Sequence, residues 1–195
     1  STRRGGQNRC GGGLTYTLYR MDADGKNLRP LSYHETNEWH PSVLHDGRIV
    51  YTRWDYVDRS AANFHGLWTC NPDGSNPAVL FGNYTHRPWA CYQAQAVPGS
   101  NRILFVAGGH HCAVGGPLVL LDPSRVSLDP GNGEDRPEAM EELTPEIRFP
   151  ESDGWSESYF FSPWPLSEKY FLTAFSHDPI GGQYAGPHPD VTGLY

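Results

Sequence analysis

Histidines are the side chains of this sequence most able to do chemistry, and the chain has nine of them in 195 residues. Several fall at expected strand entries or loop ends, together with one cysteine: Cys10, His34, His40, His65, His110 and His111. Imidazole with thiolate suits Zn²⁺, and also copper or iron. One hypothesis is therefore a zinc site built from Cys10, His34 and His40, although no short ligand spacing supports it. The alternative is that these histidines are polar loop residues bonded to backbone groups.

His110-His111-Cys112 is a second cluster with chemical potential. Adjacent residues on an extended strand point to opposite faces, so both histidines can serve one metal only if Gly108-Gly109 bends the chain. One of them could then be a metal ligand or face a haem. A structural turn is the alternative.

Charged and aromatic residues alternate between Arg53 and Arg59. On a strand, Arg53 and Asp55 share one side and Trp54 shares the other with Tyr56 and Asp58. We expect salt bridges that tie one structural unit to the next, with the aromatic rings filling the space between units. A ligand site at the mouth of a channel is the alternative.

Other catalytic chemistries find little support in the sequence. Carboxylates that could form a glycosidase pair are present, but nothing fixes their separation: Glu35, Glu38, Asp55, Glu151 and Asp153. GxSxG, HExxH, CxxCH and glycine-rich phosphate loops are absent, so the chain has no self-contained catalytic motif and its status as an enzyme stays open. A net charge of -7 without a basic stripe argues against nucleic acid as a partner. No apolar run reaches the roughly 18 residues of a membrane span.

Short strands joined by turns are the elements that must position these residues. Glycine (22) and proline (17) are frequent and aromatic residues make up 13% of the chain, which favours strands and turns over helices. A strand that runs into an Asp-Gly turn occurs at 18–25 and again at 67–74. A related strand occurs at 118–123, and another copy opens at 193.

Two further elements recur in the same order. A β-branched or aromatic strand follows each of the first three copies, at 46–52, 99–106 and 167–174. A proline-containing entry precedes each such strand: Trp39-His40-Pro41, Arg87-Pro88-Trp89 and Ser162-Pro163-Trp164-Pro165. The continuous apolar character of these strands predicts that they are covered on both faces.

This repeat predicts an all-β chain made of about three four-stranded β-propeller blades. The approximate units are 14–59, 64–112 and 116–178, with an acidic loop insertion at 124–142 and a further blade beginning at 193. An ordinary β-sandwich is the alternative. Because blades are covered only by their neighbours and closed propellers need about four to eight, we expect these residues to belong to a longer chain or to pack on partner domains.

The repeat resembles the TolB-type, WD40-like propeller repeat in residues 18–25 and 46–51. Three stretches are more specifically similar to the propeller-containing proteins related to the hydrazine synthase alpha subunit: 38–44, 51–59 and 162–170. The resemblance implies a propeller fold and an exported protein, periplasmic or extracellular. It also implies chemistry with c-type haems and zinc, but the haem attachment motif is missing here, so any haem would be carried outside this segment.

Two functions follow from this reading. The first is a non-catalytic propeller scaffold of an exported multidomain protein, which presents a face to another domain of its own polypeptide or to a protein subunit. The second is a metal- or haem-associated oxidoreductase component that resembles the hydrazine synthase alpha subunit. The propeller of a prolyl-oligopeptidase-like peptidase is a third option, and it would need a catalytic domain outside these residues.

Overall fold

The computed structural model describes residues 2–7, 14–34, 36–55, 65–82, 85–126, 137–177, 179 and 192–194. Within them the only helical elements are two short 3-10 turns, η1 (Pro123–Arg125) and η2 (Pro137–Ala139). All other regular elements are strands, which confirms the prediction of an all-β chain. No helix in this described part of the chain is long and apolar enough to cross a membrane.

Most strands belong to three antiparallel meanders that follow one another along the chain. The first meander consists of β5 (Asn37–Val43), β6 (Ile49–Trp54), β7 (His65–Cys70) and β8 (Ala78–Phe81). The second meander consists of β9 (Ala90–Ala96), β10 (Ile103–Gly108), β11 (Leu118–Leu121) and β12 (Met140–Glu142). The third meander consists of β13 (Tyr159–Pro165), β14 (Phe171–Ser176) and β15 (Thr192–Leu194).

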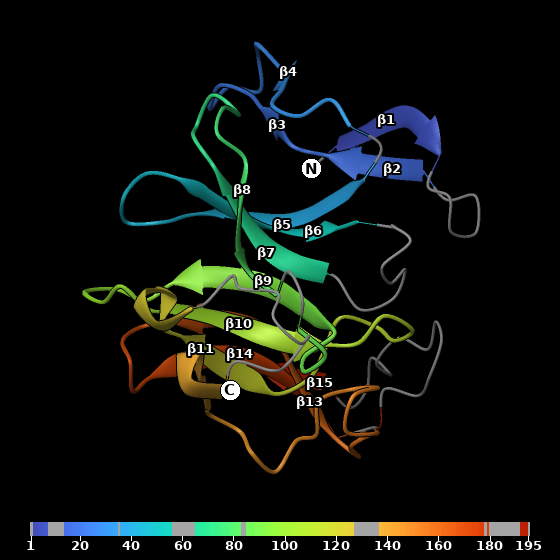
Figure 1. The fold of residues 1–195 in the computed structure, drawn as a ribbon, viewed down its shortest axis with the longest axis vertical. Helices are drawn as coiled ribbons and strands as arrows, with labels where there is room; N and C mark the ends of the chain where they lie inside the picture. Colours follow the sequence, from blue (N-terminus) through green and yellow to red (C-terminus); the bar gives the residue numbers. More distant parts are fainter. Residues whose placement is uncertain are drawn as a thin grey trace.

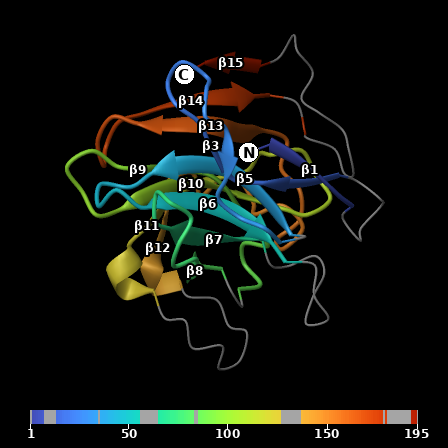
Figure 2. The same cartoon turned by 90° about the horizontal axis from the view of Figure 1, so that it is seen from above.

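Two small hairpins precede these meanders. The first pairs β1 (Thr2–Gln7) with β2 (Leu14–Thr17), and the second pairs β3 (Tyr19–Arg20) with β4 (Arg29–Pro30). Figure 1 shows the elements stacked in sequence order from these hairpins to the third meander. In the view of Figure 2, β8 and β12 lie together at an edge of the molecule away from β13, β14 and β15.

The meanders are joined mainly by packing rather than by a shared ladder. Among the described residues, the ladder between the first two meanders consists of a single parallel pair, His65 with Ala90. Their first strands lie against each other in order, because β5 packs on β9 and β9 packs on β13. Hydrogen bonds to backbone carbonyls also link the first meander to β9 and the turn after it, including Ser42 Oγ to Ala94 O (2.6 Å), Thr52 Oγ1 to Cys91 O (2.6 Å) and His45 Nε2 to Val97 O (2.7 Å).

The same backbone irregularity recurs in all three first strands. Each pairs with its second strand through a register shift, between Trp39 and Ser42 in β5, opposite Leu104 and Val106 in β9, and between Phe161 and Trp164 in β13. The fourth residue of each strand is left-handed, with φ of 51°, 54° and 48° at His40, Gln93 and Ser162. These are β-bulges at one repeated position.

The repeated bulge corrects the predicted correspondence between the three proline-containing entries. The counterpart of Trp39-His40-Pro41 in the second meander is Tyr92-Gln93-Ala94, whereas Arg87-Pro88-Trp89 lies before β9. Arg87 there forms ion pairs with Glu142 (2.7 Å) and Asp153 (2.8 Å). Proline follows the bulge residue in β5 and β13, as Pro41 and Pro163, whereas Ala94 follows it in β9.

The predicted acidic insertion also differs in part from expectation. Residues 127–136 of it lie outside the described residues. Its last three residues form β12, whose Met140 and Glu142 pair with Leu121 and Val119 of β11. A short strand of one methionine and two glutamates at a sheet edge has no apolar alternation that could signal it.

The turn chemistry expected from the repeat is present. Gly25 and Gly74 have φ of 83° and 87°, a conformation that favours glycine because it has no Cβ. The preceding aspartates accept from the backbone two residues on, with Asp24 Oδ1 to Lys26 N at 3.0 Å and Asp73 Oδ1 to Ser75 N at 2.9 Å. These are Asx turns that close the β3–β4 and β7–β8 hairpins.

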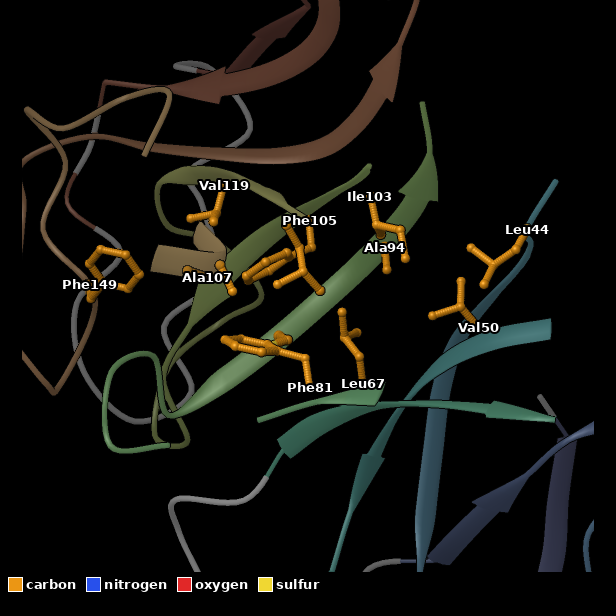
Figure 3. Close-up of a cluster of buried hydrophobic side chains, with 13 residues drawn as sticks. Leu44, Val50, Leu67, Phe81, Ala94, Ile103, Phe105, Ala107, Val119 and Phe149 are labelled. Carbon is orange, nitrogen blue, oxygen red and sulfur yellow. The ribbon is translucent and has the colours of Figure 1, made fainter. Parts of the chain in front are cut away.

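The main core lies between the first and second meanders. Figure 3 shows Leu44, Val50, Leu67 and Phe81 of the first meander and its turn facing Ala94, Ile103 and Phe105 of the second. The opposite face of the second meander has its own buried cluster, which includes Leu104, Val106 and Leu120 and packs against Phe160 and Phe171 of the third meander. Because alternate residues of β10 enter the two clusters, this strand is buried along its whole length.

Candidate functional site: a histidine–tyrosine cluster

The sequence-identified histidines His65, His110 and His111 come together at one end of the meanders. His65 begins β7, and His110 and His111 follow the end of β10. The tight turns that join the first and second strand of each meander lie at the opposite end, on the left of Figure 1. The chain leaves β10 at Gly108, so the alternation of a strand no longer applies to the two adjacent histidines. The centroids of their rings lie 4.2 Å apart. The chain therefore bends at Gly108-Gly109, which was the condition for both histidines to lie on one side.

Aromatic rings enclose this group of histidines. The Trp54 ring lies 5.0 Å from the His65 ring and 4.9 Å from the His110 ring, measured between centroids. Trp39 lies 6.0 Å from Trp54 and 5.8 Å from His65. This packing excludes water from His65 and leaves His110 only half-buried.

A chain of hydrogen bonds runs through the cluster. His110 Nδ1 lies 3.0 Å from His65 Nε2, His65 Nδ1 lies 2.8 Å from Tyr92 Oη, and Tyr92 Oη lies 3.2 Å from the Gly109 carbonyl oxygen. Complete burial lowers the pKa of His65 well below its ordinary value, with His110 and His111 adding to the shift, so the ring is neutral.

With His65 neutral, only one arrangement of hydrogens satisfies all three contacts. A carbonyl can only accept, so the Tyr92 hydroxyl donates to Gly109 and its oxygen accepts from His65 Nδ1. His65 Nε2 then carries a lone pair and accepts from His110 Nδ1. Burial lowers the pKa of His110 too, and its neutral ring therefore holds its remaining lone pair at Nε2.

Glu151 anchors the other side of the cluster. Its Oε2 accepts from the backbone N–H of His110 and from that of His111 (2.9 Å), while its Oε1 lies 2.6 Å from His111 Nδ1. The carboxylate fits only because residue 109 is glycine, since a Cβ there would lie 3.1 Å from Glu151 Cγ and closer still to its Oε2. Glu151 itself is left-handed at φ 66°, which marks a constrained position.

The cluster can accept a proton or a hydrogen bond at His110 Nε2. Every hydrogen bond of this chain has a fixed donor and acceptor, because the Gly109 carbonyl can only accept and thereby determines the tautomer of His65 and then that of His110. Sequence reasoning had singled out His110, His111, His65 and, among the carboxylates, Glu151. It missed Tyr92 and the connections themselves, which join positions 17 to 45 residues apart.

The residues of the zinc hypothesis have different surroundings. Cys10 lies outside the described residues. Both ring nitrogens of His34 are engaged, Nε2 with Glu38 Oε1 at 2.7 Å and Nδ1 with Thr36 Oγ1 at 2.7 Å. His40 instead packs edge-on against the Tyr92 ring at 5.7 Å. Among the described residues no group of three His, Cys, Asp or Glu side chains is arranged to hold a metal, and the Cys10–His34–His40 site stays a prediction.

Glu38, the partner of His34, is a fully buried carboxylate. Burial would raise its pKa, but hydrogen bonds from His34 and Ser32 outweigh that cost and the pKa lies below its ordinary value. It also accepts from the Leu18 backbone N–H at 2.9 Å. Glu38 therefore connects the 18–34 segment to β5 through hydrogen bonds. His34, as one of its partners, has a structural role.

Arg53 and Asp55 form a local pair rather than a bridge between units. Arg53 Nε lies 2.8 Å from Asp55 Oδ1, and the Arg53 guanidinium lies 4.3 Å over the Trp68 ring of the neighbouring strand in the same meander. The other members of this string, Tyr56 to Arg59, lie outside the described residues.

The described cysteines are free thiols. Cys70 and Cys91 belong to separate buried clusters. Burial raises the pKa of the Cys70 thiol to about 11 and raises that of Cys91 further. Both therefore act as small apolar core residues.

The fold and the site define an all-β protein of consecutive antiparallel meanders with a buried histidine relay. No family model matches the sequence, and no curated protein matches it. Hydrazine synthase from Kuenenia stuttgartiensis is similar in structure, with a TM-score of 0.49 and 15% sequence identity over 94% of this chain and 24% of that chain. The chain thus spans about a quarter of that protein's length, and the likeness is a distant one of fold.

Proposed function

We propose that the meanders are blades of a β-propeller and that the chain is a non-catalytic scaffold of an exported protein, on which a further blade packs. The observation that carries this proposal is the repeated geometry of β5, β9 and β13. They pack against one another in order and have the same left-handed bulge at the same position. First strands that line up side by side, with sheet faces stacked between them, are the arrangement of blades around an axis.

The exposed face of the third meander is the surface that this scaffold presents. Trp164 of β13 and Leu172 of β14 are paired across the ladder and are 58% and 42% exposed. The corresponding face of the second meander is covered by the third meander through Leu104 and Val106. A further four-stranded unit of the same kind would continue this packing, and it is the occupant we assign to the face.

Sedimentation velocity of the purified chain tests the scaffold directly. A blade face without its neighbour associates with a second copy, so we expect the average mass to rise with protein concentration. Leu172→Ser should reduce this association, while Val43→Ser, a change at a more exposed apolar residue on β5 (67% against 42%), should leave it intact. A chain that stays monomeric throughout, or that associates equally well with Leu172→Ser, contradicts the proposal.

Metal and haem analysis separates the scaffold from the oxidoreductase alternative. No arrangement among the described residues favours that alternative, and the distant fold likeness adds nothing to it. We expect the native material to lack stoichiometric zinc or iron and to show no haem absorbance. Stoichiometric metal would replace the scaffold with the oxidoreductase component and direct mutagenesis to Cys10, His34 and His40.

A further inference from the structure

A cavity of about 280 Å³ lies where the first strands of the three meanders meet. Its polar lining comes from His40 of β5, Gln93 and Gln95 of β9, and Ser162 of β13. Its apolar lining is the Trp164 ring and two prolines, Pro41 and Pro163. The residues come from the first strand of each of the three meanders.

The repeated bulges build the cavity wall. His40, Gln93 and Ser162 are all non-glycine residues in the left-handed region, a conformation that is unfavourable for residues with a Cβ. Bulges of this kind redirect a side chain and are common beside binding sites. Here they turn three polar residues, one from each strand, toward a common space.

The polar groups of the wall differ in how they are engaged. Gln93 Oε1 accepts from the Ser162 backbone N–H at 2.7 Å, which fixes β9 against β13. The side chain of Gln95 has no hydrogen-bond partner among the described residues, so its amide group is available to a ligand. His40 Nδ1 is enclosed without a partner in the same part of the structure, which is uncommon for a buried polar atom.

The lining includes no carboxylate, lysine or arginine. Such a wall suits a neutral ligand that has an apolar face for the indole ring and a rim of donors and acceptors for the amides, hydroxyl and imidazole. Its volume holds one ring rather than a peptide.

The geometry points to a binding site for one neutral sugar ring in this cavity, stacked on Trp164 and hydrogen-bonded by Gln95. This assignment goes beyond the scaffold function, which concerns the packing of blades on the outer sheet face. A free monosaccharide and the terminal unit of a glycan share this chemistry.

Isothermal titration calorimetry with the whole 195-residue chain tests the site. The probes are glucose, galactose, mannose and N-acetylglucosamine, each also as a disaccharide, with glucuronate and glucosamine as charged counterparts. We expect saturable binding of at least one neutral sugar with a Kd below roughly 10 mM, and weaker binding of the charged counterparts. A disaccharide that binds more tightly than its monosaccharide identifies a glycan end as the source.

Two variants and one control locate the binding. Trp164→Ala and Gln95→Ala should each weaken it about 10-fold or more, which corresponds to the loss of one good contact. Trp155→Ala removes a comparably exposed tryptophan outside the cavity and should leave the affinity unchanged. Failure of every neutral sugar to bind, tighter binding of a charged counterpart, or undiminished binding by Trp164→Ala would overturn the inference. Because Trp164 also belongs to the exposed face of the third meander, Gln95→Ala separates the two proposals: it should weaken sugar binding and leave the association of copies intact.

Discussion

Leu104 and Leu172 are both leucines at the second position of the second strand of consecutive meanders, yet one is buried and the other is exposed. Leu104 pairs with Gln95 across the β9–β10 ladder, and Leu172 pairs with Trp164 across β13–β14. Leu104 is 0% exposed because the third meander covers it, whereas Leu172 is 42% exposed because no described residue does so. Burial of these strands therefore comes from the neighbouring meander and not from the strand itself.

The pair Leu104→Ala and Leu172→Ala tests this difference with the largest expected effect. Leu104→Ala leaves a cavity in a packed cluster and should lower the free energy of unfolding by about 2–5 kcal/mol. Leu172→Ala removes a half-exposed side chain and should cost less than about 1 kcal/mol. Urea unfolding followed by tryptophan fluorescence measures both. Equal losses would mean that the face of the third meander is already covered.

The repeat pattern was sufficient to predict such strands, but not how each is covered. Residues 99–106 and 167–174 were recognised as equivalent strands, and both are second strands of meanders. Their apolar sequence predicted cover on both faces, which holds for β10 and fails for β14. Sequence shows which side chains are apolar, whereas the neighbour that buries them depends on tertiary packing.

The candidate site was predictable in its residues and not in its connections. The Gly108-Gly109-His110-His111 string drew attention because glycine permits the bend that two adjacent histidines need. Tyr92 had no comparable signal, because its counterparts at the same strand position are Trp39 and Phe161, which serve as aromatic packing. Only the fold shows that the hydroxyl of Tyr92 meets His65.

Tyr92→Phe extends the comparison of meanders to the relay. The change gives β9 the residue type that β13 has at Phe161, and it keeps the ring while removing the hydroxyl. The buried His65 Nδ1–H then loses its acceptor, so the free energy of unfolding should fall by about 1–3 kcal/mol. Chemical denaturation measures the loss. Phe161→Tyr, made at a position with no relay, provides the reverse control and should yield no gain in stability.

The smallest expected effect is on the pH dependence of stability, and it again distinguishes residues at equivalent positions of the meanders. His40 in β5 titrates, while its counterparts Gln93 and Ser162 do not. Burial lowers the pKa of His40 to about 4 in the folded chain from 6.5, so the unfolded state binds a proton first as the pH falls. The stability that His40 contributes is complete above pH 6.5 and is lost progressively between pH 6.5 and about 4. We expect a loss on the order of 1–2 kcal/mol, since the ring is partly exposed.

His40→Gln gives β5 the residue that β9 carries at the same left-handed position. It should flatten the pH dependence of unfolding between pH 6.5 and 4 by the contribution of His40. The part that remains belongs to groups such as His65, whose pKa burial also lowers. Denaturation curves of both proteins across this range measure the difference. An unchanged slope in the variant would mean that His40 is as accessible to protons in the folded chain as in the unfolded one, so the cavity wall around it would not exclude water.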